Sequence, residues 1–144
     1  MQWDSSHQAG FSTAKETWMR VMDSYTTINV AQQESDPTSV LSFYRRMLAL
    51  RKEHKELFVN GVFTLHNGEN EQTMIYSKTS GSDAALVVLN FTAEPQSFNR
   101  PPGMEKGELL LSTTAGKADG PLDAFEARVY LFSNFEPLQR QPRN

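Results

Sequence analysis

The second half of the chain alternates apolar and polar residues with a period of two, and this pattern restricts the possible folds most strongly. Five short runs carry it: residues 58–66, 73–78, 84–91, 107–113 and 126–132. They are rich in β-branched and aromatic residues, and turn-forming clusters such as 67–70 and 80–83 separate them. The pattern predicts a mostly β chain with a C-terminal antiparallel β-sandwich over residues 57–136. The tail, residues 137–144, is predicted to be disordered.

One amphipathic helix is predicted ahead of these runs, over residues 36–56. Asp36 suits the N-cap, and Pro37 suits the first helical position because its missing N–H costs nothing there. Apolar residues then recur at spacings of three and four: Val40, Phe43, Tyr44, Met47, Leu48 and Leu50. Each large apolar side chain contributes roughly 1.5–3 kcal/mol when buried, so this face needs a partner. The partner is either the β domain or a part of a larger protein.

Residues 1–35 show no sustained periodicity and are predicted to form an irregular loop. A loop of this length is uncommon inside a compact domain, where it is usually functional.

Charge and composition exclude several classes of partner. The 17 acidic side chains outnumber the 14 basic ones, giving a formal charge of −3, so we expect no binding to nucleic acid. The longest apolar run, residues 84–89, is too short to cross a membrane, and no signal peptide is recognisable. The chain contains no cysteine, which fits a reducing compartment. We therefore expect a cytoplasmic protein without a membrane partner.

The sequence offers no convincing catalytic or metal-binding group. His7, His54 and His66 lack the spacing of metal ligands, so no metal site and no cofactor are predicted. Residues 5–7 place two serines beside a histidine but lack the glycines of a nucleophile elbow. Asp4 and Asp23 could act as an acid–base pair only if the fold brought them together. No catalytic residue is assigned.

The segment Asn90-Phe91-Thr92 has the form of an N-glycosylation site. Because it ends the most hydrophobic predicted strand and no secretion signal is recognisable, we interpret Asn90 as a structural residue.

Five segments together resemble one known family. They are "MQWDSSHQAGFS" at the N-terminus and residues 17–33, 36–54, 85–92 and 122–132, in that order. This order is similar to the C-terminal portion of the α-glucosidases (maltase and oligo-1,6-glucosidase type) of the α-amylase superfamily, glycoside hydrolase family 13. The resemblance implies that residues 1–56 are a remnant of a catalytic (β/α)8 barrel: the loop after strand eight and the last barrel helix, residues 36–54. Residues 57–136 would form the appended β-sandwich.

The family hydrolyses terminal α-linked glucose from maltose or isomalto-oligosaccharides with retention of configuration. By this resemblance the catalytic carboxylates come from barrel strands that precede Met1, so we expect the chain alone to be inactive. Gln2 and Trp3 match a family motif near the active site, and we expect them to pack the loop onto the barrel rather than to contact sugar. The missing barrel would pack on the helix at residues 36–54, and α-glucosides would be substrates of the full-length parent.

Two alternative functions remain open. The β domain could bind α-glucan without cleaving it, by stacking Tyr76, Phe63 or Phe98 on sugar rings, although their alternating pattern favours positions in the core. The chain could also be a protein-interaction module, similar to the heavy chains of amino-acid transporters. The lack of a membrane span and of cysteines argues against that second alternative.

Overall fold

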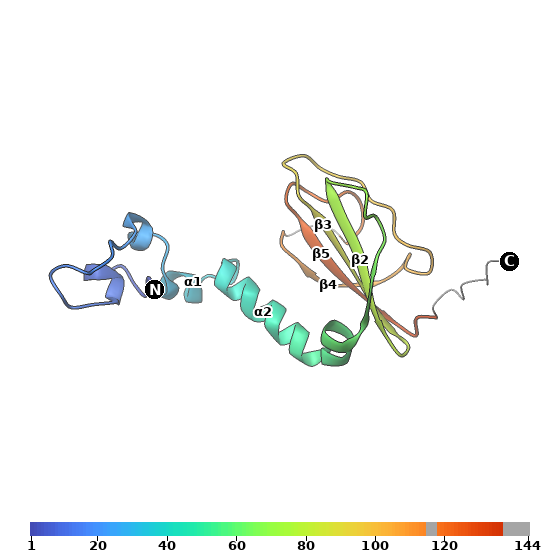
Figure 1. The fold of residues 1–144 in the computed structure, drawn as a ribbon, viewed down its shortest axis with the longest axis horizontal. Helices are drawn as coiled ribbons and strands as arrows, with labels where there is room; N and C mark the ends of the chain where they lie inside the picture. The colour runs from blue at the N-terminus through green and yellow to red at the C-terminus, as the bar shows by residue number, and fades with distance from the viewer. Residues whose placement is uncertain (115–117, 137–144) are drawn as a thin grey trace. The chain divides into compact units, whose positions relative to one another are not determined.

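The chain folds as two compact units, Met1–Leu50 and a unit that begins at Arg51 (Figure 1). The computed structural model describes residues 1–114 and 118–136. The predicted tail at 137–144 lies outside the described residues.

The first unit contains short helices in an otherwise irregular chain: η1 (His7–Gly10), η2 (Asp23–Thr26) and α1 (Val30–Ser35). The helix α1 was not predicted, because its six residues are too few for a periodic signal. Its N-cap is Asn29, whose side-chain oxygen accepts a hydrogen bond from the backbone N–H of Gln32.

The predicted amphipathic helix is present as α2 (Val40–Glu53), but the predicted N-cap is wrong. The Asp36 carboxylate instead accepts hydrogen bonds from the backbone N–H and the hydroxyl of Thr38, 2.7 Å each, and so closes a turn. Ser39 caps the helix, because its hydroxyl accepts a hydrogen bond of 3.2 Å from the N–H of Ser42. No residue of α2 is buried within the described chain, and Val40 is 77% exposed.

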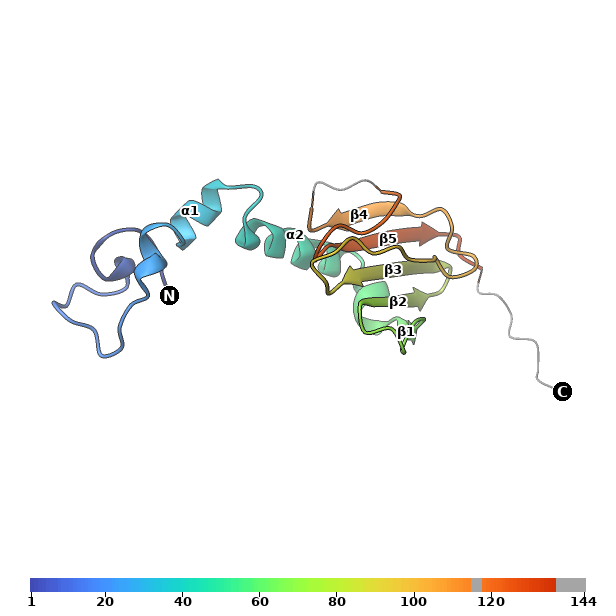
Figure 2. The same cartoon turned by 90° about the horizontal axis from the view of Figure 1, so that it is seen from above.

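The second unit is built on one antiparallel sheet. The antiparallel strands agree with the alternating pattern, whereas the two-layer β-sandwich predicted for residues 57–136 stays a prediction. Its strands are β1 (Val62–Leu65), β2 (Thr73–Ser80), β3 (Asp83–Asn90), β4 (Glu108–Ser112) and β5 (Ala127–Ser133). They lie in the order β1-β2-β3-β5-β4, which Figure 2 shows from above. Residues 58–60 were predicted to extend the first strand but belong to η3 (Glu56–Asn60), a helical turn. Outside this sheet, the described residues pair only in an isolated bridge between Gln96 and Leu122.

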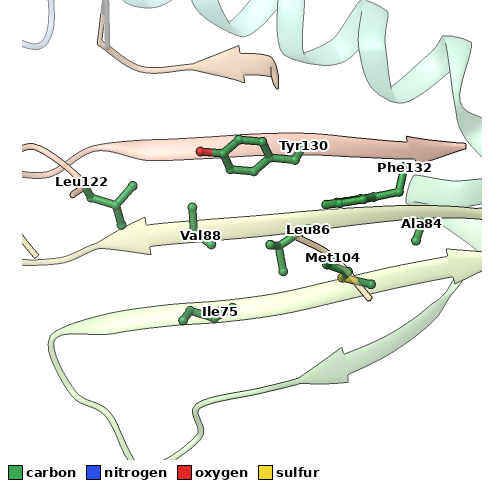
Figure 3. Close-up of a cluster of buried hydrophobic side chains, with 8 residues drawn as sticks. All are labelled: Ile75, Ala84, Leu86, Val88, Met104, Leu122, Tyr130 and Phe132. Carbon is green, nitrogen blue, oxygen red and sulfur yellow. The ribbon is translucent and has the colours of Figure 1, made fainter. Parts of the chain in front are cut away.

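One face of the sheet carries the hydrophobic core (Figure 3). Alternate residues of the central strands supply most of it, and loop residues cover them. The cluster consists of Ile75, Ala84, Leu86, Val88, Met104, Leu122, Tyr130 and Phe132. Gly107 is needed beside it, because a Cβ there would lie 2.5 Å from the Phe132 ring.

A buried ion pair joins β5 to the loop before it. The Glu126 side chain is fully buried, the Arg128 side chain is 2% exposed, and their closest atoms are 2.7 Å apart. The guanidinium also donates to the carbonyls of Gly120 and Pro121 at 3.0 and 2.7 Å. Desolvation raises the pKa of Glu126, but hydrogen bonds from Arg128, Asp123 and Ser112 outweigh it and lower that pKa to about 2.

The η3 turn covers part of the opposite face of the sheet. The Lys78 ammonium donates to the carbonyls of Phe58 and Val59 at 3.0 and 3.3 Å. These bonds satisfy carbonyls at the end of the turn. Leu57, in the same turn, is only 3% exposed.

Candidate functional site

The backbone of Gln2 and Trp3 is tied to the start of α1. Val30 donates its N–H to the Gln2 carbonyl, and Ala31 donates to the Trp3 carbonyl, both at 2.9 Å. The Gln2 amide also donates to the carbonyl of Met22 at 3.2 Å. The side chain of Trp3 stays 48% exposed. Both residues therefore organise the first unit, and contact with a barrel or with sugar remains a prediction.

A tight turn follows them and uses unusual backbone angles. Gln8, Ala9 and Gly10 have φ values of 52°, 55° and 64°, in the left-handed region, and Ala9 is fully buried. The Asp4 carboxylate accepts hydrogen bonds from the hydroxyl and the backbone N–H of Ser6, and these bonds lower the pKa of Asp4. Glycine suits position 10, because its φ of 64° is strained for other residues and a Cβ would lie 2.6 Å from an Asp4 carboxylate oxygen.

The structure does not assemble a nucleophile from residues 5–7. The Ser6 hydroxyl donates to Asp4, while the His7 Nε2 lies 3.0 Å from the carbonyl of Ala14. Asp4 and Asp23 each have another partner, since Asp4 accepts from Ser6 and Asp23 forms an ion pair with Arg20. These contacts give each group a local structural partner.

The first unit contains an open pocket of about 520 Å³. Its lining includes His7, Gln8, Glu16, Trp18, Arg20 and Asp23. The side chain of Trp18 is fully exposed. Sequence reasoning missed this pocket. The available signal was a single tryptophan with Glu16 and Arg20 two residues to either side, within a segment that has no periodicity.

The other two histidines lie in the second unit. His54 contacts Phe58 edge to face, with ring centroids 6.1 Å apart. His66 places its Nε2 2.8 Å from the hydroxyl of Ser77, and partial desolvation lowers its pKa. Within residues 1–114 and 118–136, no cluster of three His, Cys, Asp or Glu residues could hold a metal ion.

The three candidate stacking aromatics occupy two different environments. Phe98 packs against the hydrophobic core, as its alternating pattern favours. Phe63 and Tyr76 lie on the other face of the sheet, with ring centroids 5.2 Å apart and ring planes inclined by 34°. Phe63 is 53% exposed, and desolvation raises the pKa of Tyr76.

Asn90, in the glycosylation-like segment, is 3% exposed. Its amide nitrogen donates to the carbonyls of Glu94 and Asp123, 2.8 Å each, and its oxygen accepts from the N–H and hydroxyl of Thr92. The side chain thus holds together two loops at the end of β3.

None of the helices in the described part of the chain combines the length and the apolar character needed to span a membrane.

Comparison with known proteins finds sequence similarity to α-glucosidases and oligo-1,6-glucosidases. Residues 1–61 match the family described as "Alpha amylase, catalytic domain". An α-glucosidase of Candida albicans is 37% identical over 134 residues, which cover 91% of this chain and 23% of the relative. An oligo-1,6-glucosidase of Bacillus cereus is 34% identical over 131 residues, or 90% of this chain and 23% of the relative.

The fold of the chain is also similar to that of solved structures. The trehalulose synthase MutB of Pseudomonas mesoacidophila MX-45 matches with a TM-score of 0.85 and 34% identity, over 90% of this chain and 24% of that enzyme. One structure of a MutB mutant holds the substrate sucrose. The chain spans about a quarter of the length of the relatives it matches.

Proposed function

The chain is related to the α-glucosidases and oligo-1,6-glucosidases of the α-amylase superfamily, glycoside hydrolase family 13, and on that premise we propose that it supplies the non-catalytic C-terminal portion of a retaining α-glucosidase. The full enzyme would release terminal α-linked glucose from maltose or isomalto-oligosaccharides. The chain alone would be inactive. The observation that carries this proposal is the match of nine tenths of the chain to a quarter of each relative.

Two segments of the chain, which divide a few residues after the boundary between the two compact units, would then belong to different parts of the parent enzyme. Residues 1–56 would be the remnant of the catalytic barrel, with α2 as its last helix, and residues 57–136 would be the appended β-sandwich. The match of residues 1–61 to the catalytic domain supports this assignment. So does the apolar side of α2, where Val40, Tyr44 and Leu48 are 77%, 53% and 47% exposed. We propose that the rest of the barrel covers this side.

The chemistry of retention supports the expected inactivity. It requires two carboxyl groups about 5–5.5 Å apart, one as nucleophile and one as acid and base. In the first unit, Asp4 is engaged by Ser6 and Asp23 by Arg20. The local contacts of these two carboxylates give them structural roles, so the catalytic pair would come from the rest of the barrel.

Complementation tests the proposal. The purified chain is assayed on maltose, isomaltose and an aryl α-glucoside, alone and with the remaining three quarters of the Candida albicans α-glucosidase supplied as a second polypeptide. We expect no turnover from the chain alone, and turnover from the mixture. Turnover that persists through purification of the chain alone would contradict the proposal.

Variants of α2 test the docking. Tyr44→Glu places a charge on the apolar side of the helix and should abolish complementation. Lys52→Glu, which changes a residue already charged and exposed, should leave complementation intact. Equal behaviour of the two variants would show that the barrel does not use this side of α2.

A second candidate function is α-glucan binding by the sheet unit. The pair Phe63 and Tyr76, side by side on the sheet with Phe63 half exposed, favours it. Saturable retention on an amylose matrix, lost in Tyr76→Ala, would support this function. Retention that persists in Tyr76→Ala would exclude this pair as the binding surface.

A further inference from the structure

We infer that the pocket beside Trp18 binds one neutral sugar ring, which the proposed function identifies as a glucosyl unit of an α-glucoside. The pocket lies entirely within the first unit. The inference depends on the proposed function for the identity of the sugar, and on the pocket's own geometry and chemistry for the rest.

Two side-chain bridges shape the pocket wall. The His7 Nε2 lies 3.0 Å from the Ala14 carbonyl, and the Gln8 amide donates to the Lys15 carbonyl at 3.1 Å. Each bridge spans seven residues, so together they close the loop of residues 7–15 and hold its end, directly before Glu16, beside the left-handed turn. A backbone hydrogen bond holds the turn in place: the N–H of Trp3 donates to the carbonyl of the buried Ala9 at 2.9 Å.

Trp18 supplies an aromatic surface at the pocket. The Thr17 hydroxyl donates to the Met19 carbonyl at 2.6 Å and so stabilises the short segment that presents the indole. Sugar rings present C–H groups that pack on an aromatic face, and the indole N–H can donate to a sugar hydroxyl. One exposed indole accommodates one ring, so the ligand is a single unit rather than an extended chain.

The polar lining suits a neutral ligand with many hydroxyl groups. Gln8, Glu16, Arg20 and Asp23 bring both donors and acceptors to the pocket. Arg20 is already paired with Asp23, which leaves the Glu16 charge uncompensated and disfavours an anionic ligand. Among the hydrogen bonds of the described residues, none uses the Glu16 carboxylate or the Trp18 indole, so both can bind sugar hydroxyls.

The volume is consistent with this ligand. About 520 Å³ falls within the roughly 300–1,000 Å³ of small-molecule sites. Because the pocket is open and offers one aromatic surface, we expect weak binding, with a Kd on the order of 1 mM.

Intrinsic fluorescence tests the inference, because Trp3 and Trp18 are the two tryptophans of the chain. Maltose is titrated into the full chain and into Trp3→Phe, which leaves Trp18 as the reporter. We expect a saturable change in both. No saturable change at maltose concentrations far above the expected Kd would overturn the inference.

Matched variants locate the site. In the Trp3→Phe background, Glu16→Ala keeps the reporter and should raise the Kd at least five-fold, whereas Glu53→Ala, an exposed acid on α2, should leave it unchanged. Saturation-transfer NMR on maltose should show binding that Trp18→Ala abolishes and Tyr76→Ala preserves. The opposite pattern would place the sugar on the sheet and overturn the inference.

These results are independent of the complementation assay. A failed titration with successful complementation removes only the pocket, whereas failed complementation with a positive titration removes the proposed enzyme and leaves a sugar-binding pocket. Far-UV circular dichroism confirms that each variant is folded.

Discussion

Replacing the buried Glu126 by glutamine is expected to lower the free energy of unfolding of the sheet unit by about 3–5 kcal/mol. One carboxylate oxygen accepts from Arg128 Nε at 2.7 Å and from the Ser112 hydroxyl at 2.9 Å. The other accepts from Arg128 Nη2 at 2.7 Å and from the Asp123 N–H at 2.8 Å. All four partners donate, so a glutamine NH₂ in place of either oxygen would face donors and leave a buried cation without its counter-charge.

The lowered pKa of Glu126 and the cost of breaking a buried ion pair both lead to this loss of stability. The pKa of Glu126 falls from 4.5 to about 2 in the folded chain, and each pKa unit corresponds to about 1.4 kcal/mol, giving about 3 kcal/mol. Breaking a buried ion pair by removing one partner costs about 3–5 kcal/mol. A small domain has a total stability of about 5–15 kcal/mol, so the loss would be a large part of it.

Urea unfolding followed by far-UV circular dichroism measures this loss. Tryptophan fluorescence would not report it, because both tryptophans lie in the first unit. Hydrogen exchange of β5 provides a second, local measurement. Glu108→Gln is the matched control, because Glu108 is exposed on β4, and we expect a change within about 0.5 kcal/mol. A Glu126→Gln variant within about 1 kcal/mol of the parent would refute the account of the ion pair.

Three further predictions concern the same unit. Because the folded-state pKa of Glu126 is lowered to about 2, the stability that its charge contributes is present above pH 4.5 and is lost as the pH falls toward 2. The urea concentration at the unfolding midpoint, measured at a series of pH values, should fall over this range, and the fall should be smaller in Glu126→Gln. Gly61→Ala should destabilise the unit by about 1–3 kcal/mol in urea, because its Cβ would lie 2.3 Å from the Leu57 carbonyl oxygen, and an unchanged midpoint would contradict this contact. Asn90→Ala should cost about 1–3 kcal/mol in thermal unfolding by leaving buried groups unpaired, whereas the exposed Asn99→Ala should be near neutral; equal effects would refute the structural role of Asn90.

The sequence pattern predicted structure correctly where burial of apolar side chains dominates. The alternation of apolar and polar residues predicted all five strands, because burial of one sheet face imposes a period of two. It failed at helix ends, where polar side chains compete for the same backbone groups. Asp36 was a plausible cap, yet it binds Thr38 instead, and Ser39 caps α2.

In the candidate site, too, some residues could be predicted from the sequence and others could not. Gln2 and Trp3 could be identified from their motif, but the pocket at Trp18 could not. Its walls depend on the bridges from His7 and Gln8 to carbonyls seven residues away, which leave no periodic signal.

The amino-acid sequence by itself determined the strands, the amphipathic helix and the family, because these depend on short-range periodicity and on the order of motifs. Tertiary structure alone decided which strands are neighbours: β5 lies between β3 and β4, although β4 precedes it in the chain. It also decided which polar groups meet, as Glu126 and Arg128 do inside the core. Strand order and buried pairing depend on how the loops close in three dimensions, and that closure is a property of the whole fold.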